Sequence, residues 1–184
     1  MTRSSFLIVV MLALASPASA QSHAAATSAV AKIANAMSAA PAAVAAGATI
    51  LDWPATPDGE SPVLRPGTNG WTCFPDMAET PVDDPMCLDE VWLALFDAWS
   101  RHAPYRPTSL GMAYMLQGAA DASLTDPFLA EPARGDQWII SGPHVMLVAP
   151  AGGLSAALPA RPDGGSPYVM WKGTPYEHVM MPVR

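Results

Sequence analysis

The sequence has few basic residues. Lysine and arginine together number 9 in 184 residues, against 16 aspartates and glutamates, and they form no cluster. Binding to nucleic acid or to anionic lipid depends on basic side chains that neutralise phosphates. Neither nucleic acid nor an anionic membrane surface is therefore an expected partner, and an acidic, solvated surface that maintains solubility accounts for the charge.

The sequence also lacks the common catalytic motifs. It contains no G-x-S-x-G nucleophile elbow, no H-E-x-x-H motif, no phosphate-binding or dinucleotide-binding glycine loop and no C-x-x-C-H haem motif. Three histidines and three acids are available for acid–base chemistry: His102, His144, His178, Asp126, Asp136 and Glu177. No spacing singles out a nucleophile, so the catalytic residues stay unknown. A hydrolase or isomerase with a histidine-based site remains an alternative, and the sequence leans away from an enzyme.

Only one long apolar run is present, over residues 6–15. It has about half of the roughly 20 residues that a helix needs to cross a bilayer. An arginine precedes it, and the small residues Ala18 and Ala20 follow at the spacing that signal peptidase accommodates. We predict a signal peptide over residues 1–20, cleaved before Gln21. The expected product is periplasmic or secreted, without an integral membrane segment.

The remaining 164 residues suffice for one domain with its own core. Residues 21–47 are rich in alanine, the best helix former, and we expect a helical or partly disordered leader there. Val30, Ile33 and Met37 would form its narrow apolar stripe. Residues 48–184 are expected to form a single α+β domain. The whole chain contains 20 prolines and 13 glycines, which favour short elements joined by turns.

One segment has the spacing of an amphipathic helix, and we place that helix at residues 86–102. Asp84 and Pro85 are suited to its N-cap and first helical position. The apolar residues that recur at helical spacing are Leu88, Val91, Trp92, Leu95, Phe96 and Trp99. This helix should cover one sheet.

The strands of that sheet are expected at residues 48–53, 63–65, 71–74, 110–116, 137–140, 145–148, 168–171 and 178–183. Asn69-Gly70 suits a hairpin connection between the second and third of them. Residues 118–136 show no clear period and are expected to form a loop or a short helix. The predicted fold is α+β, with a single, mainly antiparallel sheet.

Cys73 and Cys87 are the only cysteines. Two cysteines in an oxidising compartment usually pair, so we predict a structural disulfide. A redox-active pair is the alternative, because a thiol at a helix N-terminus has a lowered pKa. The C-x-x-C spacing of exchange enzymes is absent, which favours the structural disulfide.

The pattern H-x-M occurs twice, as His144 with Met146 and as His178 with Met180. Residues i and i+2 of a strand face the same way, and imidazole and thioether groups suit Cu(I). A copper site made of these four residues is therefore one hypothesis. The competing interpretation is that the methionines fill the core and that each histidine hydrogen-bonds a nearby carbonyl or carboxylate. We favour this second interpretation and expect no cofactor.

Residues 141–146 and the run from Pro167 to Pro182 resemble a family of uncharacterised exported bacterial proteins. The resemblance covers most of residues 48–184, implies no activity and supplies no catalytic residue. The leading functional hypothesis is a soluble exported domain that binds a small ligand or a protein partner. A periplasmic Cu(I)-binding protein is the second hypothesis.

Overall fold

The computed structural model describes residues 27–183 except 57–58, 133, 136 and 151–152. The predicted signal peptide lies outside the described residues. The helices are α1 (Ala29–Ser38), α2 (Ala42–Ala45), α3 (Glu90–Ser100) and the short 3₁₀ helix η1 (Ser155–Ala157). The strands are β1 (Thr49–Leu51), β2 (Val63–Arg65), β3 (Thr72–Phe74), β4 (Met86–Leu88), β5 (Gly111–Met115), β6 (Ala119–Ser123), β7 (Trp138–Ser141), β8 (His144–Val148), β9 (Tyr168–Met170) and β10 (His178–Pro182).

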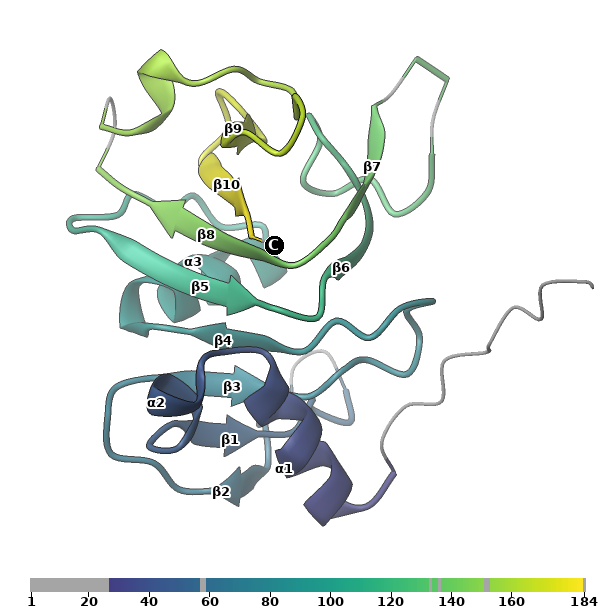
Figure 1. Cartoon of the computed structure of the whole chain (residues 1–184), viewed down its shortest axis with the longest axis vertical. Coiled ribbons are helices and arrows are strands. Elements are labelled where there is room, and N and C mark those ends of the chain that lie inside the picture. The colour runs from purple at the N-terminus through teal and green to yellow at the C-terminus, as the bar shows by residue number, and fades with distance from the viewer. Residues whose placement is uncertain (1–26, 57–58, 133, 136, 151–152, 184) are drawn as a thin grey trace, which may run out of the picture.

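Eight of these strands form one sheet in the order β2-β1-β3-β4-β5-β8-β10-β9 (Figure 1). All its pairings are antiparallel except that of β1 with β3. The prediction of a mixed fold with a mainly antiparallel sheet is confirmed. The prediction of a single sheet is wrong, because β6 and β7 form a separate two-stranded sheet. β6 lies in the segment for which we expected a loop or a short helix.

The predicted hairpin around Asn69-Gly70 is also wrong. β2 and β3 do not pair with each other, because β1 lies between them and bonds to both. Gly70 does adopt a positive φ of 77°, so the turn chemistry was recognised correctly while the pairing was not. A turn signal fixes the local chain reversal, but it does not exclude the insertion of a third strand.

The helix that we placed at residues 86–102 is shorter. Met86–Leu88 is the strand β4, which pairs with β3 and β5, and α3 begins only at Glu90. Its N-cap is Asp89, whose Oδ1 accepts a hydrogen bond of 2.8 Å from the backbone N–H of Trp92. The other oxygen of Asp89 accepts from the backbone N–H of Met112 on β5, at 2.6 Å. Asp89 therefore both starts the helix and holds it on the sheet.

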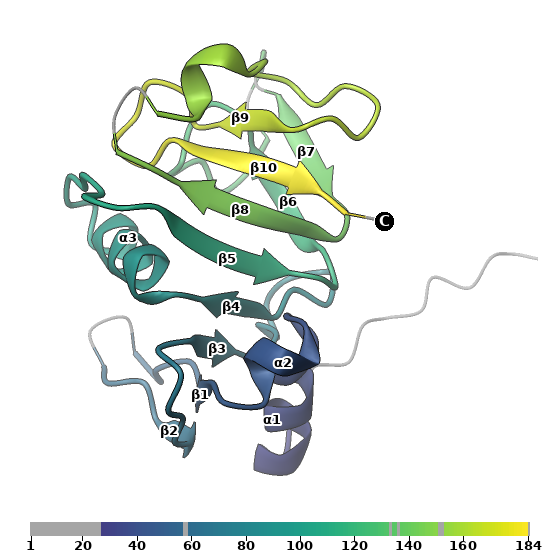
Figure 2. The same ribbon diagram turned by 60° about the vertical axis from the view of Figure 1, so that its left-hand side comes forward.

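The helices lie on opposite faces of the sheet. α3 packs on one face against β4 and β5, and α1 and α2 lie on the other face over β1 to β4 (Figures 1 and 2). The side chains of the two faces form two separate clusters. One contains Trp92, Leu95 and the methionines of the later strands, and the other contains Ile50 and both cysteines. The first cluster is the main core.

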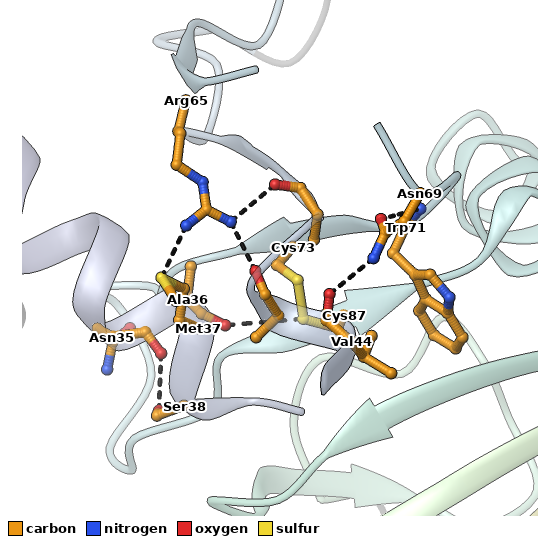
Figure 3. Close-up of a disulfide and its surroundings, with 12 residues drawn as sticks. Asn35, Ala36, Met37, Ser38, Val44, Arg65, Asn69, Trp71, Cys73 and Cys87 are labelled. Carbon is orange, nitrogen blue, oxygen red and sulfur yellow. Dashed lines mark hydrogen bonds between the residues drawn. A yellow bond between two sulfur atoms is a disulfide. The ribbon is translucent and has the colours of Figure 1, made fainter. Parts of the chain in front are cut away.

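The described part of the segment that we expected to be a leader, residues 27–47, packs closely on the sheet. Ala36, in α1, and Ala39, just after α1, are fully buried. Val30, a member of the expected apolar stripe, is 79% exposed. Alanine allows this close approach, since the sulfur of Cys87 lies 3.7 Å from the carbonyl oxygen of Ala36 (Figure 3). Arg65 adds two hydrogen bonds of 2.6 and 2.8 Å to backbone carbonyls at the end of α2 and just after it. Hydrogen bonds from Arg65 therefore reinforce the small apolar contact between the alanine-rich helices and the sheet.

Candidate functional site

A pocket of about 320 Å³ lies between the main core face of the eight-stranded sheet, α3 and the β6–β7 sheet. We call it the core pocket. Six of the eleven methionines line it: Met77, Met86, Met115, Met146, Met170 and Met180. The described residues of its wall include no lysine or arginine, and the acidic side chains among them are those of Asp84 and Asp126. The pocket is therefore largely apolar.

Strand register explains why methionines gather there. Met146 on β8 lies opposite Met180 on β10, and His144 lies opposite Met115 on β5. His178 lies opposite Met170 on β9. Because alternate residues of a strand point to the same face, all these side chains project from one face of the sheet. The two H-x-M patterns were the sequence signal for this shared face.

The outer wall of the pocket consists of residues 119–130, which we call the cover segment. Two indoles hold it in place. Trp99 of α3 donates its Nε1–H to the carbonyl of Pro127 at 2.9 Å, and Trp171 donates to the carbonyl of Ser123 at 3.0 Å. Trp99 was expected to be buried against the sheet. It is only half-buried, and it packs on Trp171 and the cover segment instead.

His144 and His178 both line the core pocket and are almost fully buried, with exposed fractions of 2% and 3%. The Nδ1 atom of His144 lies 2.7 Å from the carbonyl of Gly142, and that of His178 lies 2.9 Å from the carbonyl of Tyr176. A carbonyl oxygen only accepts hydrogen bonds, so each Nδ1 carries the proton. When the ring is neutral, its Nε2 therefore has a free lone pair.

Burial keeps these rings neutral. It lowers the pKa of His144 below its usual value of 6.5, against the opposing effect of the hydrogen bond to Gly142. Burial is the main reason that the pKa of His178 is lowered to about 4, the hydrogen bond to Tyr176 opposes it, and the imidazole of His144 contributes a smaller lowering. His178 is also held edge-on against two indoles, those of Trp92 and Trp171, at centroid distances of 5.1 and 5.0 Å. At neutral pH both imidazoles therefore act as hydrogen-bond acceptors at Nε2.

Two buried polar atoms of the pocket residues lack a hydrogen-bond partner among the described residues. They are Nε2 of His144, an acceptor, and Nε1 of Trp92, a donor. Trp92 is only 4% exposed. The indoles of Trp53, Trp99 and Trp171 all donate to backbone carbonyls. Buried polar groups normally have partners, so these two atoms are exceptions, and because they have almost no accessible surface a ligand could reach them only if neighbouring side chains moved.

A pair of buried carboxyls also borders this region. Asp84 lines the core pocket, and Asp76 accepts a hydrogen bond of 3.1 Å from the backbone N–H of Asp84. Burial, together with a side-chain hydrogen bond to Asp76, raises the pKa of Asp84 to about 6. Thr80 donates its hydroxyl to Asp84 at 3.1 Å. From the sequence we expected Asp84 to be a helix cap, and its place at the pocket was not predicted.

The copper hypothesis required His144, Met146, His178 and Met180 to meet. All four line the core pocket. Met146 and Met180 lie opposite each other, and each histidine precedes its methionine by two residues. Because β8 and β10 are antiparallel, the two histidines are displaced from this pair in opposite directions. At about 3.3 Å per residue the Cα atoms of the two histidines are offset by roughly 13 Å along the strands. Among the described residues, no group of three or more His, Cys, Asp or Glu side chains is placed to hold a metal. The four-residue copper site stays a prediction, and the offset of the two histidines along the strands argues against it.

Cys73 and Cys87 form a disulfide and are fully buried on the opposite face of the sheet. They lie directly opposite each other in the β3–β4 pair. The redox alternative relied on Cys87 lying at a helix N-terminus. Since Cys87 is in a strand, that argument for a lowered thiol pKa no longer applies.

A second hollow, of about 580 Å³, lies over the other face of β8 and β10. Leu147 and Val179 line it, together with residues 104–107 and 173–175. His178 is its only lining residue that the core pocket shares. Neither of the two unpartnered buried atoms belongs to its wall. The core pocket is therefore the better candidate site.

The structure separates the other residues that we considered for acid–base chemistry. His102 lies away from the core pocket and stacks on Phe128 at 3.9 Å. Asp126 lines the core pocket, whereas Glu177 lines the second hollow and accepts from the backbone N–H of Gly173 at 2.6 Å. Asp136 is outside the described residues.

The chain matches no protein-family model, no curated protein and no solved structure. The resemblance to exported bacterial proteins therefore stays a prediction. Within the part of the chain that the structure describes, no helix is both long and apolar enough to cross a membrane. The geometry of the core pocket is what remains to support a function.

Proposed function

We propose that this chain is a binding protein for a small, largely apolar molecule, which it holds in the core pocket. The observation that carries the proposal is the wall of this pocket, in which six methionines and several aromatic side chains surround the cavity. Ligand sites are typically apolar cavities of about 300–1,000 Å³ with a few polar groups that fix orientation. The core pocket, at about 320 Å³, is at the small end of that range.

The methionines support binding as well. A thioether side chain is flexible and polarizable, so it adapts to ligands of different outline and makes favourable contacts with aromatic ring edges. Met146 and Met180 form the centre of the strand wall, and the indoles of Trp99 and Trp171 face the cover segment. A flat apolar molecule between these groups would have thioethers and rings on its surface.

Binding is a better explanation than nucleophilic catalysis. In a catalytic triad a carboxylate orients the histidine and stabilises its charged form. Here the two pocket histidines are oriented by the carbonyls of Gly142 and Tyr176, and burial disfavours their protonation. Such rings are poorly suited to accepting a proton from a nucleophile.

The test uses p-xylene, a small apolar probe, with the purified full chain. A ligand that binds the folded state alone stabilises it by about 2.7 kcal/mol at a hundredfold excess over Kd, so the melting temperature should rise with p-xylene concentration. Ala122 lines the pocket, and Ala122→Phe should abolish the rise by filling it. Ala94 is on the exposed side of α3, and Ala94→Phe is the matched control that should retain it. No rise in the unmodified chain would overturn the proposal.

Cu(I) binding is a second candidate function, with a smaller ligand set than the sequence suggested. Met146 lies opposite Met180, His144 belongs to the same pocket wall, and its buried Nε2 has no partner among the described residues. One imidazole and two thioethers suit Cu(I). Titration of Cu(I) in competition with a chromogenic chelator tests this set. Binding should be lost in the variant Met146→Leu/Met180→Leu, and retention of binding in that variant would exclude it.

We also propose that the chain is exported and cleaved before Gln21. A buried disulfide supports this, because such bonds persist in oxidising compartments. The intact mass of the protein from the periplasmic fraction or medium of an expressing bacterium tests it. A product that retains residues 1–20 would contradict the cleavage.

A further inference from the structure

We infer that residues 76–84, which connect β3 to β4, form a pH-dependent closure of the core pocket. This segment, which we call the acidic loop, is closed while the carboxyl of Asp84 is protonated and bonded to Asp76, and it opens when Asp84 ionises. The inference rests on the proposed function, because it names how access to the same pocket is regulated.

The acidic loop forms one side of the core pocket. Met77, Thr80 and Asp84 all line the cavity, and Met86 lines it where β4 begins. Met77, Thr80 and Met86 are only half-buried, so this side of the pocket lies close to solvent. A displacement of the loop would therefore expose the cavity without moving a strand of the sheet.

The ends of the acidic loop are fixed, whereas its middle is exposed. Pro75 and Pro85 flank the loop and are fully buried, and the disulfide joins the two strands beyond them. In the middle of the loop, Ala78, Glu79 and Pro81 are exposed. Segments with few buried apolar contacts open at low free energy. The loop is therefore built to move between two fixed ends.

Two carboxyls hold the loop in its closed position. Asp76 and Asp84, near its two ends, are 7% and 5% exposed, and Oδ1 of Asp76 accepts from the backbone N–H of Asp84 at 3.1 Å. Oδ1 of Asp84 lies 3.1 Å from the hydroxyl of Thr80 and accepts from the backbone N–H of Met77 at 3.4 Å. The two ends and the middle of the loop therefore meet at the carboxyl of Asp84.

The proton on Asp84 determines whether this arrangement is favourable. Burial, together with a side-chain hydrogen bond to Asp76, raises the pKa of Asp84 from 3.8 to about 6. Once Asp84 ionises, it faces a second buried carboxylate, and like charges at close range repel. In an open loop Asp84 is solvated, so between about pH 3.8 and 6 the closed loop binds a proton that the open loop does not. The equilibrium therefore shifts towards the open loop as pH rises through this range.

The surrounding charges do not offset the repulsion. The charged and titratable groups on the elements around Asp84 are Asp76, Glu79 and Asp83 on the loop, Lys32 on α1, Asp52 after β1, and Asp126, His144 and His178 in the pocket wall. Lys32 is paired with Asp52 at 2.7 Å. Burial lowers the pKa of both histidines, so neither is a cation at neutral pH. The described elements around ionised Asp84 therefore contribute acids and no unpaired cation.

The experiment follows opening through the oxidation of Met115 by hydrogen peroxide in the purified full chain. Met115 lines the core pocket and is 6% exposed, and the register of β4 with β5 places it beside Met86. A thioether is oxidised to the sulfoxide and has no proton to titrate, so its own reactivity changes little with pH. Peptide mass spectrometry gives the initial rate at Met115 relative to that at Met181, a half-buried reference on the opposite face of β10.

The relative rate at Met115 should be at least about fivefold higher at pH 7 than at pH 4.5, because one proton shifts the opening equilibrium by at most tenfold per pH unit. Urea unfolding at the same two pH values separates local from global opening. A rise no larger than the change in the unfolding constant would mean that the whole chain opens, and it would overturn the inference.

Three variants identify the groups. Asp84→Asn cannot ionise and keeps a donor towards Asp76, so its relative rate at Met115 should stay low at both pH values. Asp76→Asn removes the facing carboxylate and should also reduce the pH dependence, which provides the test if Asp84→Asn does not fold. Glu79→Gln changes an exposed acid of the same loop and is the matched control that should retain the full rise. A full rise in Asp84→Asn would overturn the inference.

Binding of p-xylene distinguishes this inference from the proposed function. In the unmodified chain p-xylene should enter the pocket faster at pH 7 than at pH 4.5, as followed by stopped-flow tryptophan fluorescence, and in Asp84→Asn the two rates should be equal. Binding of p-xylene with a Met115 rate that does not depend on pH would overturn the closure and leave the binding pocket standing. A pH-dependent Met115 rate without any p-xylene binding would support the closure and overturn the proposed function.

Discussion

Trp99 and Trp171 stack with ring centroids 6.0 Å apart, and each donates its indole N–H to a backbone carbonyl of the cover segment. The two residues come from different elements, since Trp99 is on α3 and Trp171 follows β9. Trp171 also has a positive φ of 54°, which an ordinary side chain adopts only at some cost. The backbone N–H of Trp171 bonds the carbonyl of Leu124 at 2.9 Å as well. This stacked pair therefore holds the outer wall of the core pocket, together with the pairing of β6 with β7.

The first prediction concerns the strength of this attachment. Trp99→Phe and Trp171→Phe each remove an N–H group and leave a carbonyl of the cover segment without its donor. Each should lower the free energy of unfolding by about 1 kcal/mol and increase hydrogen exchange of the backbone over residues 119–130. Trp71→Phe, on the opposite face of the sheet beside Tyr114, is the matched control for loss of ring area. Unchanged exchange in the cover segment would show that the indoles do not hold it.

The second prediction concerns the disulfide. Cys73 and Cys87 are 14 residues apart in sequence and join adjacent strands beneath α1. Closing a loop of this length stabilises a protein by roughly 3 kcal/mol in the chain-entropy model. Reduction should therefore lower the urea midpoint markedly. Intact mass after alkylation should show no modified cysteine before reduction and two afterwards. Two alkylated cysteines in the unreduced protein would contradict the disulfide.

Local sequence patterns predicted the strands well and their partners poorly. Seven of the eight expected strands overlap strands of the main sheet, and the eighth, at residues 137–140, overlaps β7. Alternation of apolar residues is a local property, so a single sequence carries it. Pairing is not local, and nothing in residues 63–74 indicates that β1 would lie between β2 and β3. β6 was missed because AADAS contains residues that are depleted in strands.

Part of the candidate site was also readable from the sequence. The two H-x-M patterns predicted that histidine and methionine would share a strand face, and His144 and His178 both line the core pocket. Trp92 was expected as an ordinary core residue, because periodicity reports burial and does not report whether an indole N–H finds a partner. The cover segment was not predictable either, since its position depends on contacts with Trp99 and Trp171, far away in the sequence.

The third prediction concerns pH, where Asp84 and His178 act in opposite directions. Burial lowers the pKa of His178 to about 4, so between pH 6.5 and 4 the unfolded chain binds a proton there that the folded protein does not. That effect lowers the free energy of unfolding as pH falls. Burial raises the pKa of Asp84 to about 6, so between about pH 6 and 3.8 the folded protein binds the extra proton. That effect raises the free energy of unfolding as pH falls.

The variant Asp84→Asn should reveal these two opposing effects, because it removes the contribution of Asp84 and leaves that of His178. The quantity to compare is the free energy of unfolding of the unmodified chain minus that of the variant. This difference should fall as pH rises through about 6, by at most about 1.4 kcal/mol per pH unit for one proton. His144, whose pKa burial also lowers, adds to the effect of His178 in both proteins, and Asp76 is the carboxyl that faces Asp84. Urea unfolding between pH 4.5 and 8 measures the difference. Asp163→Asn, which removes an exposed carboxyl, is the control, and a difference curve for Asp84→Asn that is flat or rises would contradict the prediction.

The last prediction compares two tryptophans that differ in one hydrogen bond. Trp53 donates its Nε1–H to the carbonyl of Pro75 at 2.7 Å, whereas the buried Nε1–H of Trp92 has no partner among the described residues. Tryptophan→Phe removes the same atoms at both sites. At Trp53 it also breaks a hydrogen bond, whereas at Trp92 it removes a buried donor whose lack of a partner is itself destabilising.

Trp92→Phe should therefore lower the free energy of unfolding by about 1–2 kcal/mol less than Trp53→Phe, although Trp92 is the more buried of the two. Ring area alone predicts the opposite order, because the loss of buried volume is larger at the better-packed site. Urea unfolding of the two variants in the absence of any ligand decides between these expectations. A larger loss at Trp92 would contradict the prediction, because it would show that the packing of the ring outweighs the difference of one hydrogen bond.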